Sequence, residues 1–246
     1  EGPDALKLYN EIGNGNERSA VAFSKSLPRD VGARIIRSNF LRAAVLIEWL
    51  DGPPLAKKYH AGEYAEPTRK ACELIAKLST VKFQWGFAYR RLTPLVKQRI
   101  KASAGPKPSA DEVMLLKQAL QLFEEHFNQR RLERIVHGDL HYDNMIETPN
   151  GIRMFDPKGL RAHPMMELVN ILKPPKTETD LLAFEERIKE QISIISSMLG
   201  FRQEELFRFL LFQTLINALK TKSNPKNFEN YRKKLDAITQ LANTTS

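Results

Sequence analysis

Cysteine and long apolar runs are both scarce in this chain of 246 residues. Its single cysteine, Cys72, can form no disulfide within the chain and no cysteine-rich metal site. This usage is typical of the reducing cytoplasm, where we expect the protein to act. The longest apolar stretch, residues 209–219, is interrupted by Gln213 and Asn217 and is too short to cross a bilayer. We therefore expect no membrane partner.

Acidic residues are fewer than basic ones, 29 against 38, which gives a formal net charge of +9. The basic residues are spread along the chain, and the densest runs are pairs such as Lys57-Lys58. Proteins that bind single-stranded nucleic acid combine basic with aromatic residues, and that interleaving is missing here. We expect a solvated basic surface and no nucleic-acid partner, with nucleic-acid binding as the alternative. The sequence leaves the oligomeric state open.

The N-terminal part of the chain reads as mixed strand and helix. Apolar alternation predicts short strands, and a polar stretch over 10–16 predicts a loop before a helix at 17–27. The strands are expected at 5–9, 33–37 and 43–50. Asp51-Gly52-Pro53-Pro54 then breaks the pattern. We place a domain boundary there, between a small β-rich nucleotide-binding lobe (1–52) and a larger catalytic and substrate-binding lobe (53–246).

Beyond the boundary the apolar period becomes helical. The expected helices lie at 67–79, 92–102, 111–131, 177–199, 203–222 and 228–242. A short strand is expected at 134–137, and the segments 145–148 and 152–155 flank Pro149-Asn150-Gly151, a strong hairpin signal. The fold class is therefore α+β.

The chemistry is concentrated in residues 135–159, IVHGDLHYDNMIETPNGIRMFDPKG. If the hairpin turns near Asn150, the residue numbers of each opposed pair sum to about 300, give or take one for the loop type. Asn144 and Asp156 sum to 300, so we expect them to lie opposite each other, about 5 Å apart. Mg²⁺ prefers oxygen ligands and usually binds one or two protein side chains together with phosphate oxygens of a nucleotide. One Asn amide and one Asp carboxylate meet that preference. Asp139, upstream on the same loop, is placed to accept a proton. The alternative is that these are ordinary turn residues in a solvated loop.

The motifs HGDLHYDN and DPKG resemble those of the aminoglycoside phosphotransferase superfamily, and DPKG resembles its streptomycin and hydroxyurea phosphotransferase branch. The resemblance implies a protein-kinase-like two-lobe fold and ATP and Mg²⁺ as cofactors. It also implies transfer of the γ-phosphoryl group to a hydroxyl of a small molecule, an aminoglycoside such as streptomycin. Two alternatives stay open: a kinase of another metabolite alcohol, and a kinase-like nucleotide-binding module without catalysis.

The resemblance assigns roles to the side chains of the catalytic segment. Asp139 is the expected catalytic base, and Asn144 and Asp156 are the expected metal ligands. His141 is expected beside the transferred phosphate, with a polar surface residue as the alternative. Lys158 is expected either to face phosphate or substrate or to point into solvent.

The resemblance also implies a nucleotide site. Lys7, inside the first strand, is expected to contact nucleotide phosphates, and Glu17 to be its ion-pair partner. The backbone from Glu48 to Leu50 is expected to bind adenine. Related kinases carry two strands and a phosphate-covering loop before the strand lysine, whereas only six residues precede Lys7. We therefore expect an N-terminal segment to be missing from this sequence.

Two further residues are expected to be structural. His137 opens the HGD motif and is expected to brace the catalytic loop. Glu167, in the segment HPMMELVNIL, resembles an acidic residue that the family places after the metal-binding Asp. We expect it to brace the site as well. The alternative is an ordinary carboxylate in the first turn of a helix, where the helix dipole favours a negative charge.

Overall fold

A computed structural model describes residues 4–8, 16–39, 41, 44–83, 89–105, 107–173, 178 and 180–244, except for the side chains of residues 16, 17, 99 and 104. Most of the expected loop at 10–16, and the last residue of the expected first strand, lie outside this description. The chain forms two compact units: Glu1–Arg91 with Arg134–Ile171, and Leu92–Glu133 with Leu172–Ser246. The expected lobe boundary after Gly52 lies inside the first unit and stays a prediction.

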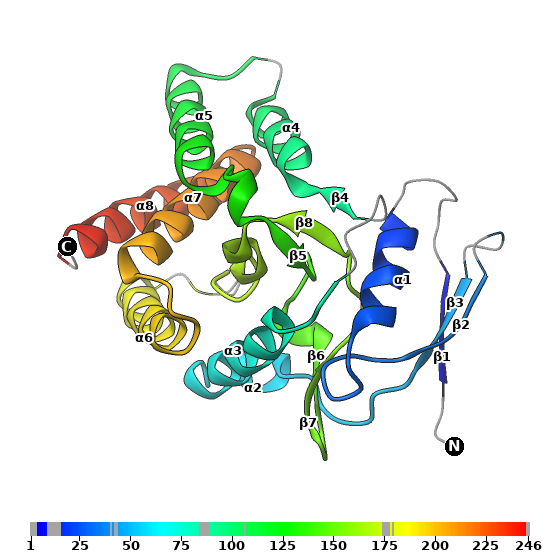
Figure 1. Cartoon of the computed structure of the whole chain (residues 1–246). Coiled ribbons are helices and arrows are strands. Elements are labelled where there is room, and N and C mark those ends of the chain that lie inside the picture. The colour runs from blue at the N-terminus through cyan, green and yellow to red at the C-terminus, as the bar shows by residue number, and fades with distance from the viewer. Residues whose placement is uncertain are drawn as a thin grey trace. The chain divides into compact units, whose positions relative to one another are not determined.

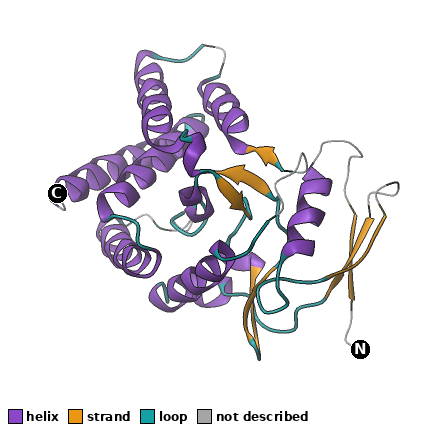
Figure 2. Cartoon of the chain, in the orientation of Figure 1, coloured by secondary structure: helices purple, strands orange, loops and turns teal. Residues whose placement is uncertain are grey.

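An antiparallel three-stranded sheet begins the first unit (Figures 1 and 2). Its strands are β1 (Asp4–Leu8), β2 (Ile35–Asn39) and β3 (Ala44–Glu48), in the order β1-β3-β2. On β1, the half-buried Lys7 alternates with the exposed Leu6 and Leu8, because successive side chains of a strand point to opposite faces. The helix α1 (Asn16–Ser26) contributes Ser19 and Phe23 to the interior.

The predicted hairpin forms from β6 (Met145–Thr148) and β7 (Gly151–Met154). Its register pairs Met145 with Met154, so paired numbers sum to 299, one less than the expected value. The hairpin is also bound along both edges. The N–H of Ala33 donates to the Met154 carbonyl at 2.8 Å, and that of Leu55 donates to the Met145 carbonyl at 2.9 Å. Backbone from two distant segments thus fixes the hairpin that carries the site.

A second small sheet supports the loop before the hairpin. It consists of β4 (Arg90–Arg91), β8 (Leu160–Ala162) and β5 (Arg134–Val136), in the order β4-β8-β5. The pairing of β8 with β5 is antiparallel, so the chain beyond the DPKG motif returns beside the strand that leads to Asp139. The helices α2 (Ala56–His60) and α3 (Ala65–Ser79) and a 3-10 turn, Pro164–Leu168, complete this unit. Sequence analysis missed β4, β8 and α2, because no apolar run marks these two- to five-residue elements in the sequence.

The second unit is helical. Its helices are α4 (Leu92–Ala104), α5 (Ala110–Leu122), α6 (Leu181–Leu199), α7 (Gln203–Thr221) and α8 (Pro225–Thr244). The expected helix at 111–131 is wrong in its second half, where a π turn, Phe123–Phe127, and a 3-10 turn, Arg130–Leu132, replace it. The π turn lets both Phe123 and Phe127 pack against Phe212 of α7, at ring distances of 5.7 and 5.4 Å. Within the described residues, no helix combines the length and apolar character needed to cross a bilayer.

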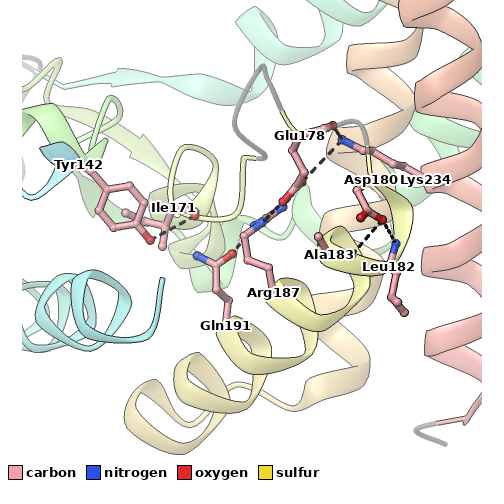
Figure 3. A network of polar contacts seen from close by, with 9 residues as sticks. All are labelled: Tyr142, Ile171, Glu178, Asp180, Leu182, Ala183, Arg187, Gln191 and Lys234. Carbon is pink, nitrogen blue, oxygen red and sulfur yellow. Dashed lines mark hydrogen bonds and ion pairs between the residues drawn. The ribbon is translucent and has the colours of Figure 1, made fainter. Parts of the chain in front are cut away.

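Helix α6 starts at Leu181, four residues later than expected, because Asp180 caps it by accepting from the N–H groups of Leu182 and Ala183. A buried ion cluster lies beside this cap (Figure 3). Arg187 donates to Glu178 at 2.7 and 2.9 Å and also to Gln191. Lys234 of α8 donates to the Glu178 carbonyl at 2.9 Å. The cluster joins α6 and α8 to the segment before α6.

Candidate active site

Asp139 lies on a short loop that begins at the end of β5 and folds onto itself. The N–H of Asn144 donates to the His141 carbonyl at 2.8 Å. The Asn144 amide nitrogen donates to the Asp139 carbonyl at 3.0 Å. These contacts hold Asn144 against the backbone of Asp139 and leave the amide oxygen of Asn144 outside them.

His137 joins this loop to the DPKG motif. Its ring contacts the Phe155 carbonyl through Nε2 at 2.9 Å and accepts from the Asp139 N–H through Nδ1 at 3.3 Å. Its own carbonyl accepts from the N–H groups of Lys158 and Gly159, at 2.8 and 3.1 Å. Burial lowers the pKa of His137 to about 4, so the ring is neutral and donates to Phe155 through Nε2. One buried ring thus connects the residue before Asp156 to Asp139 itself.

Glu167 holds the same loop from its other side. The backbone N–H of His137 donates to both carboxyl oxygens of Glu167, at 3.1 and 2.9 Å. The backbone N–H of Gly138 also donates to this carboxyl group. Burial raises the pKa of Glu167 to about 8, although the two backbone donors act in the opposite direction. The carboxyl therefore occupies the bracing position that the sequence led us to expect.

Two side chains contact the Asp139 carboxyl group. The Asn170 amide nitrogen donates to Oδ1 at 3.2 Å, and the Lys158 Nζ lies 3.4 Å from Oδ2. Sequence analysis missed Asn170, although an amide inside the apolar run of HPMMELVNIL was a usable signal. For Lys158 it left solvent exposure open, and the structure directs the ammonium group toward Asp139 instead.

Lys7 reaches the site from β1 and forms an ion pair with Asp156. Burial lowers the pKa of Lys7 to about 8; the charge of Lys158 lowers it further, and Asp139 opposes the shift. A cavity of about 20 Å³ lies beside the pair, lined by the sheet, α1 and Phe155. Pockets that hold drug-sized ligands measure roughly 300 Å³ or more, so this cavity is much smaller than a ligand site of that kind.

Asn144 and Asp156 meet the chemical requirement for a hard cation. In the described part of the chain, no hydrogen bond occupies Asn144 Oδ1 or Asp156 Oδ2, which leaves one oxygen on each side chain for an ion. Among the described non-glycine residues, Asp156 alone has a positive φ, 59°. The residue before it, Phe155, donates its N–H to the Asn144 carbonyl at 3.1 Å. The described residues contain no cluster of three or more His, Cys, Asp or Glu side chains, and the roles of Asn144 and Asp156 as metal ligands stay a prediction.

The start of α1 is tied to the DPKG motif. The Ser19 hydroxyl donates to the Lys158 carbonyl at 2.8 Å. Gly159, at a φ of 61°, approaches the Ser19 carbonyl so closely that a Cβ atom would overlap it. Glu17 lies in the first turn of the same helix, but its side chain is outside the described residues, so the ion pair with Lys7 stays a prediction.

The expected adenine-binding segment is held by an ion pair. Arg153 of β7 donates to both carboxylate oxygens of Glu48, at 2.9 and 2.7 Å, and to the Gly32 carbonyl at 2.8 Å. The Glu48 N–H already donates to the Arg34 carbonyl, at 2.9 Å. Leu50 is buried, with Ile146 and Phe155 beside it. The backbone contact with adenine at Glu48 and Leu50 stays a prediction.

His141 is about one-third exposed and faces its own loop. Its Nδ1 atom lies 3.2 Å from Asp143 Oδ2. Among the described contacts, none joins its ring to Asp139 or Asp156. Its expected place beside the transferred phosphate stays a prediction.

Solved structures of known kinases share this fold at low sequence identity. The choline kinase LicA from Streptococcus pneumoniae matches with a TM-score of 0.61 at 14% identity, over 96% of this chain and 86% of that one. A choline/ethanolamine kinase family protein from Mesorhizobium loti matches with a TM-score of 0.62 at 14% identity, over 99% and 82%. A thermostable mutant of the aminoglycoside phosphotransferase APH(4)-Ia, in a ternary complex with ADP and hygromycin B, matches with a TM-score of 0.55 at 12% identity, over 92% and 82%. The expected kinase-like α+β fold is confirmed.

No curated protein sequence matches the chain significantly. A family model does, over residues 16–224, and its description is aminoglycoside/hydroxyurea antibiotic resistance kinase. The match includes the HGDLHYDN and DPKG motifs and confirms the expected enzyme class, a phosphotransferase with a hydroxyl group as acceptor. On a match that covers most of its length, this chain belongs to the family of aminoglycoside/hydroxyurea antibiotic resistance kinases.

Proposed function

We propose that this protein transfers the γ-phosphoryl group of ATP to a hydroxyl of an aminoglycoside such as streptomycin, with Mg²⁺ as the metal. One observation carries the proposal. The neutral His137 ring ties the backbone of Asp139 to the residue before Asp156, so the proton acceptor and the metal-binding side belong to one hydrogen-bonded structure. A single cysteine and ATP as the donor favour the cytoplasm as the place of action.

Asp139 has the partners that a catalytic base requires. Asn170 and Lys158 fix its two carboxylate oxygens and hold the group toward an incoming hydroxyl. Transfer forms the bond between the acceptor oxygen and the γ-phosphorus as the bond to the β,γ-bridging oxygen breaks, and Asp139 takes the hydroxyl proton. Asn144 and Asp156 would hold Mg²⁺, which neutralises phosphate charge when bound.

Nucleotide binding requires a change at Lys7. The Lys7–Asp156 contact occupies the space beside the small cavity, so we expect the two side chains to separate when phosphates arrive. Lys7 then exchanges a carboxylate for phosphate oxygens, and Asp156 exchanges an ammonium group for the metal. The structural neighbours support a nucleotide at this fold, since LicA was solved with AMP and APH(4)-Ia with ADP.

The family supports an aminoglycoside as the proposed acceptor. Its description names aminoglycoside and hydroxyurea resistance, and the APH(4)-Ia structure contains hygromycin B. The alternative is a metabolite alcohol, which the similarity to choline and ethanolamine kinases favours. An ADP-release screen with streptomycin, hygromycin B, choline and ethanolamine separates the two, because a family-type acceptor predicts activity with the antibiotics alone.

Point variants test the roles of the catalytic residues. We expect Asp139→Ala to lower kcat by about 10²-fold or more while the ATP-induced rise in Tm persists, because the base acts on the hydroxyl and not on the nucleotide. Asp156→Ala should instead abolish the Mg²⁺-dependent part of that rise. Asp30→Ala, which removes an exposed carboxylate of the first unit, is the control and should keep wild-type values. Wild-type turnover by Asp139→Ala would contradict the assignment of the base.

A further inference from the structure

The main chain of Lys158 is fixed on both sides. Its N–H donates to the His137 carbonyl at 2.8 Å, and its carbonyl accepts from the Ser19 hydroxyl at 2.8 Å. The side chain is about one-third exposed and places its Nζ atom 3.4 Å from Asp139 Oδ2. A long, flexible side chain thus starts from an anchored backbone and ends at the proton acceptor.

The charge of Lys158 also reaches the phosphate-binding side of the site. It is the second cause, after burial, of the lowered pKa of Lys7, which itself contacts Asp156. The Lys158 ammonium group is therefore close to the expected base and also acts electrostatically on the lysine expected to bind phosphates. In the proposed reaction the phosphoryl group moves from a nucleotide at Lys7 to an acceptor at Asp139, the two groups on which this charge acts.

His141 is the rival for the same task, since the sequence favoured it as the group beside the transferred phosphate. Its ring nitrogen instead faces Asp143, at 3.2 Å.

We propose that Lys158 is a catalytic residue whose ammonium group contacts the phosphoryl group during transfer and stabilises the negative charge that accumulates on its oxygens. The proposal rests on the proposed function. Lys158 keeps its protons throughout: the hydroxyl proton passes to Asp139, and the electron pair of the broken bond stays on ADP. Its contribution is positive charge held in place before the reaction begins.

The test compares Lys158→Met with Lys158→Arg in the full chain, with ATP, Mg²⁺ and streptomycin. We expect Lys158→Met to lower kcat by about 10² to 10³-fold, the usual cost of losing one charge-stabilising donor, with the KM for ATP nearly unchanged. Lys158→Arg should recover at least about tenfold of that loss because it restores the charge. The matched control is Lys57→Met, an exposed lysine of α2, which should keep the wild-type kcat.

Three outcomes would overturn the inference. A kcat of Lys158→Met within about threefold of wild type would exclude a role in transfer. A raised KM for ATP with unchanged kcat would assign Lys158 to ground-state binding. Equal losses in the Met and Arg variants, with equally lowered Tm, would assign it to structure.

Failure of the proposed function gives a different pattern. If wild type releases ADP but does not phosphorylate streptomycin, the proposed acceptor is wrong. The Lys158 variants are then compared by their rates of ATP hydrolysis, in which water accepts the phosphoryl group. If wild type releases no ADP with or without streptomycin, both proposals fall. Wild-type transfer to streptomycin that Lys158→Met leaves intact overturns only the inference about Lys158.

Discussion

Glu167→Gln gives a quantitative test of the brace beneath the catalytic loop. Glu167 is 4% exposed, and its carboxyl group accepts from the backbone N–H groups of His137 and Gly138. Its pKa is raised from 4.5 to about 8, chiefly by burial. The folded protein therefore holds a proton on this carboxyl at pH values where the unfolded chain has released it.

The sign and size of the effect follow from proton linkage. Because the folded pKa is the higher one, the stability from this group is complete below about pH 4.5 and is lost as the pH rises through about 8. Between those values the free energy of unfolding should fall by about 1.4 kcal/mol per pH unit, to an upper limit of about 5 kcal/mol. Glutamine cannot titrate, so the variant should lack this slope.

The assay is urea unfolding of wild type and Glu167→Gln from pH 5.5 to 8.5, because the difference between the two cancels the other titrating groups. We expect wild type to lose stability relative to the variant as the pH rises, and the difference to level off above pH 8. Glu63→Gln, which removes an exposed carboxyl of the same unit and keeps Glu167, is the control and should lose stability in parallel with wild type. A difference that stays constant across this range would refute the raised pKa and with it a protonated brace.

Two further predictions concern packing. Gly159→Ala should destabilise the chain by more than about 1 kcal/mol and lower kcat, since its φ of 61° and the Ser19 carbonyl both oppose a Cβ atom. Gly62→Ala is the control for backbone strain alone, because Gly62 has a φ of 90° and open space where the Cβ atom would lie. Equal losses of Tm in the two variants would contradict a steric overlap at Gly159. Arg187→Met should lower the free energy of unfolding by about 3 to 5 kcal/mol because it leaves the Glu178 carboxylate buried without its main partner. An unchanged urea midpoint for that variant would contradict this reasoning.

The hairpin could be predicted from the sequence because local rules govern it, whereas the metal-binding roles of Asn144 and Asp156 stay a prediction. Asn150-Gly151 fixes the turn and two alternating segments fix the strands, which brings the backbone of Asn144 beside Phe155 at the open end. The register differs by one pair, and Phe155 rather than Asp156 lies opposite Asn144. The exact loop type decides such a shift, and composition does not reveal it.

The partners of Asp139 could not be predicted in the same way. Asn170 lies 31 residues away along the chain, and its approach depends on β8 pairing with β5, a three-residue contact without a sequence signal. The contact of Lys158 depends on the left-handed turn at Asp156 and Gly159, which aims the motif back at the loop. Tertiary packing sets both contacts.

The hydrogen bonds of His137 have a consequence for how such enzymes diversify. The hydrogen bonds of Asp139 within the described residues, and its ion pair with Lys158, all involve residues between 137 and 170. A stretch of some three dozen amino acids therefore supplies these direct partners of Asp139, while Ser19, Ala33 and Leu55 of the same unit hold the stretch in place. Substitutions elsewhere in the chain leave this set of direct partners chemically intact.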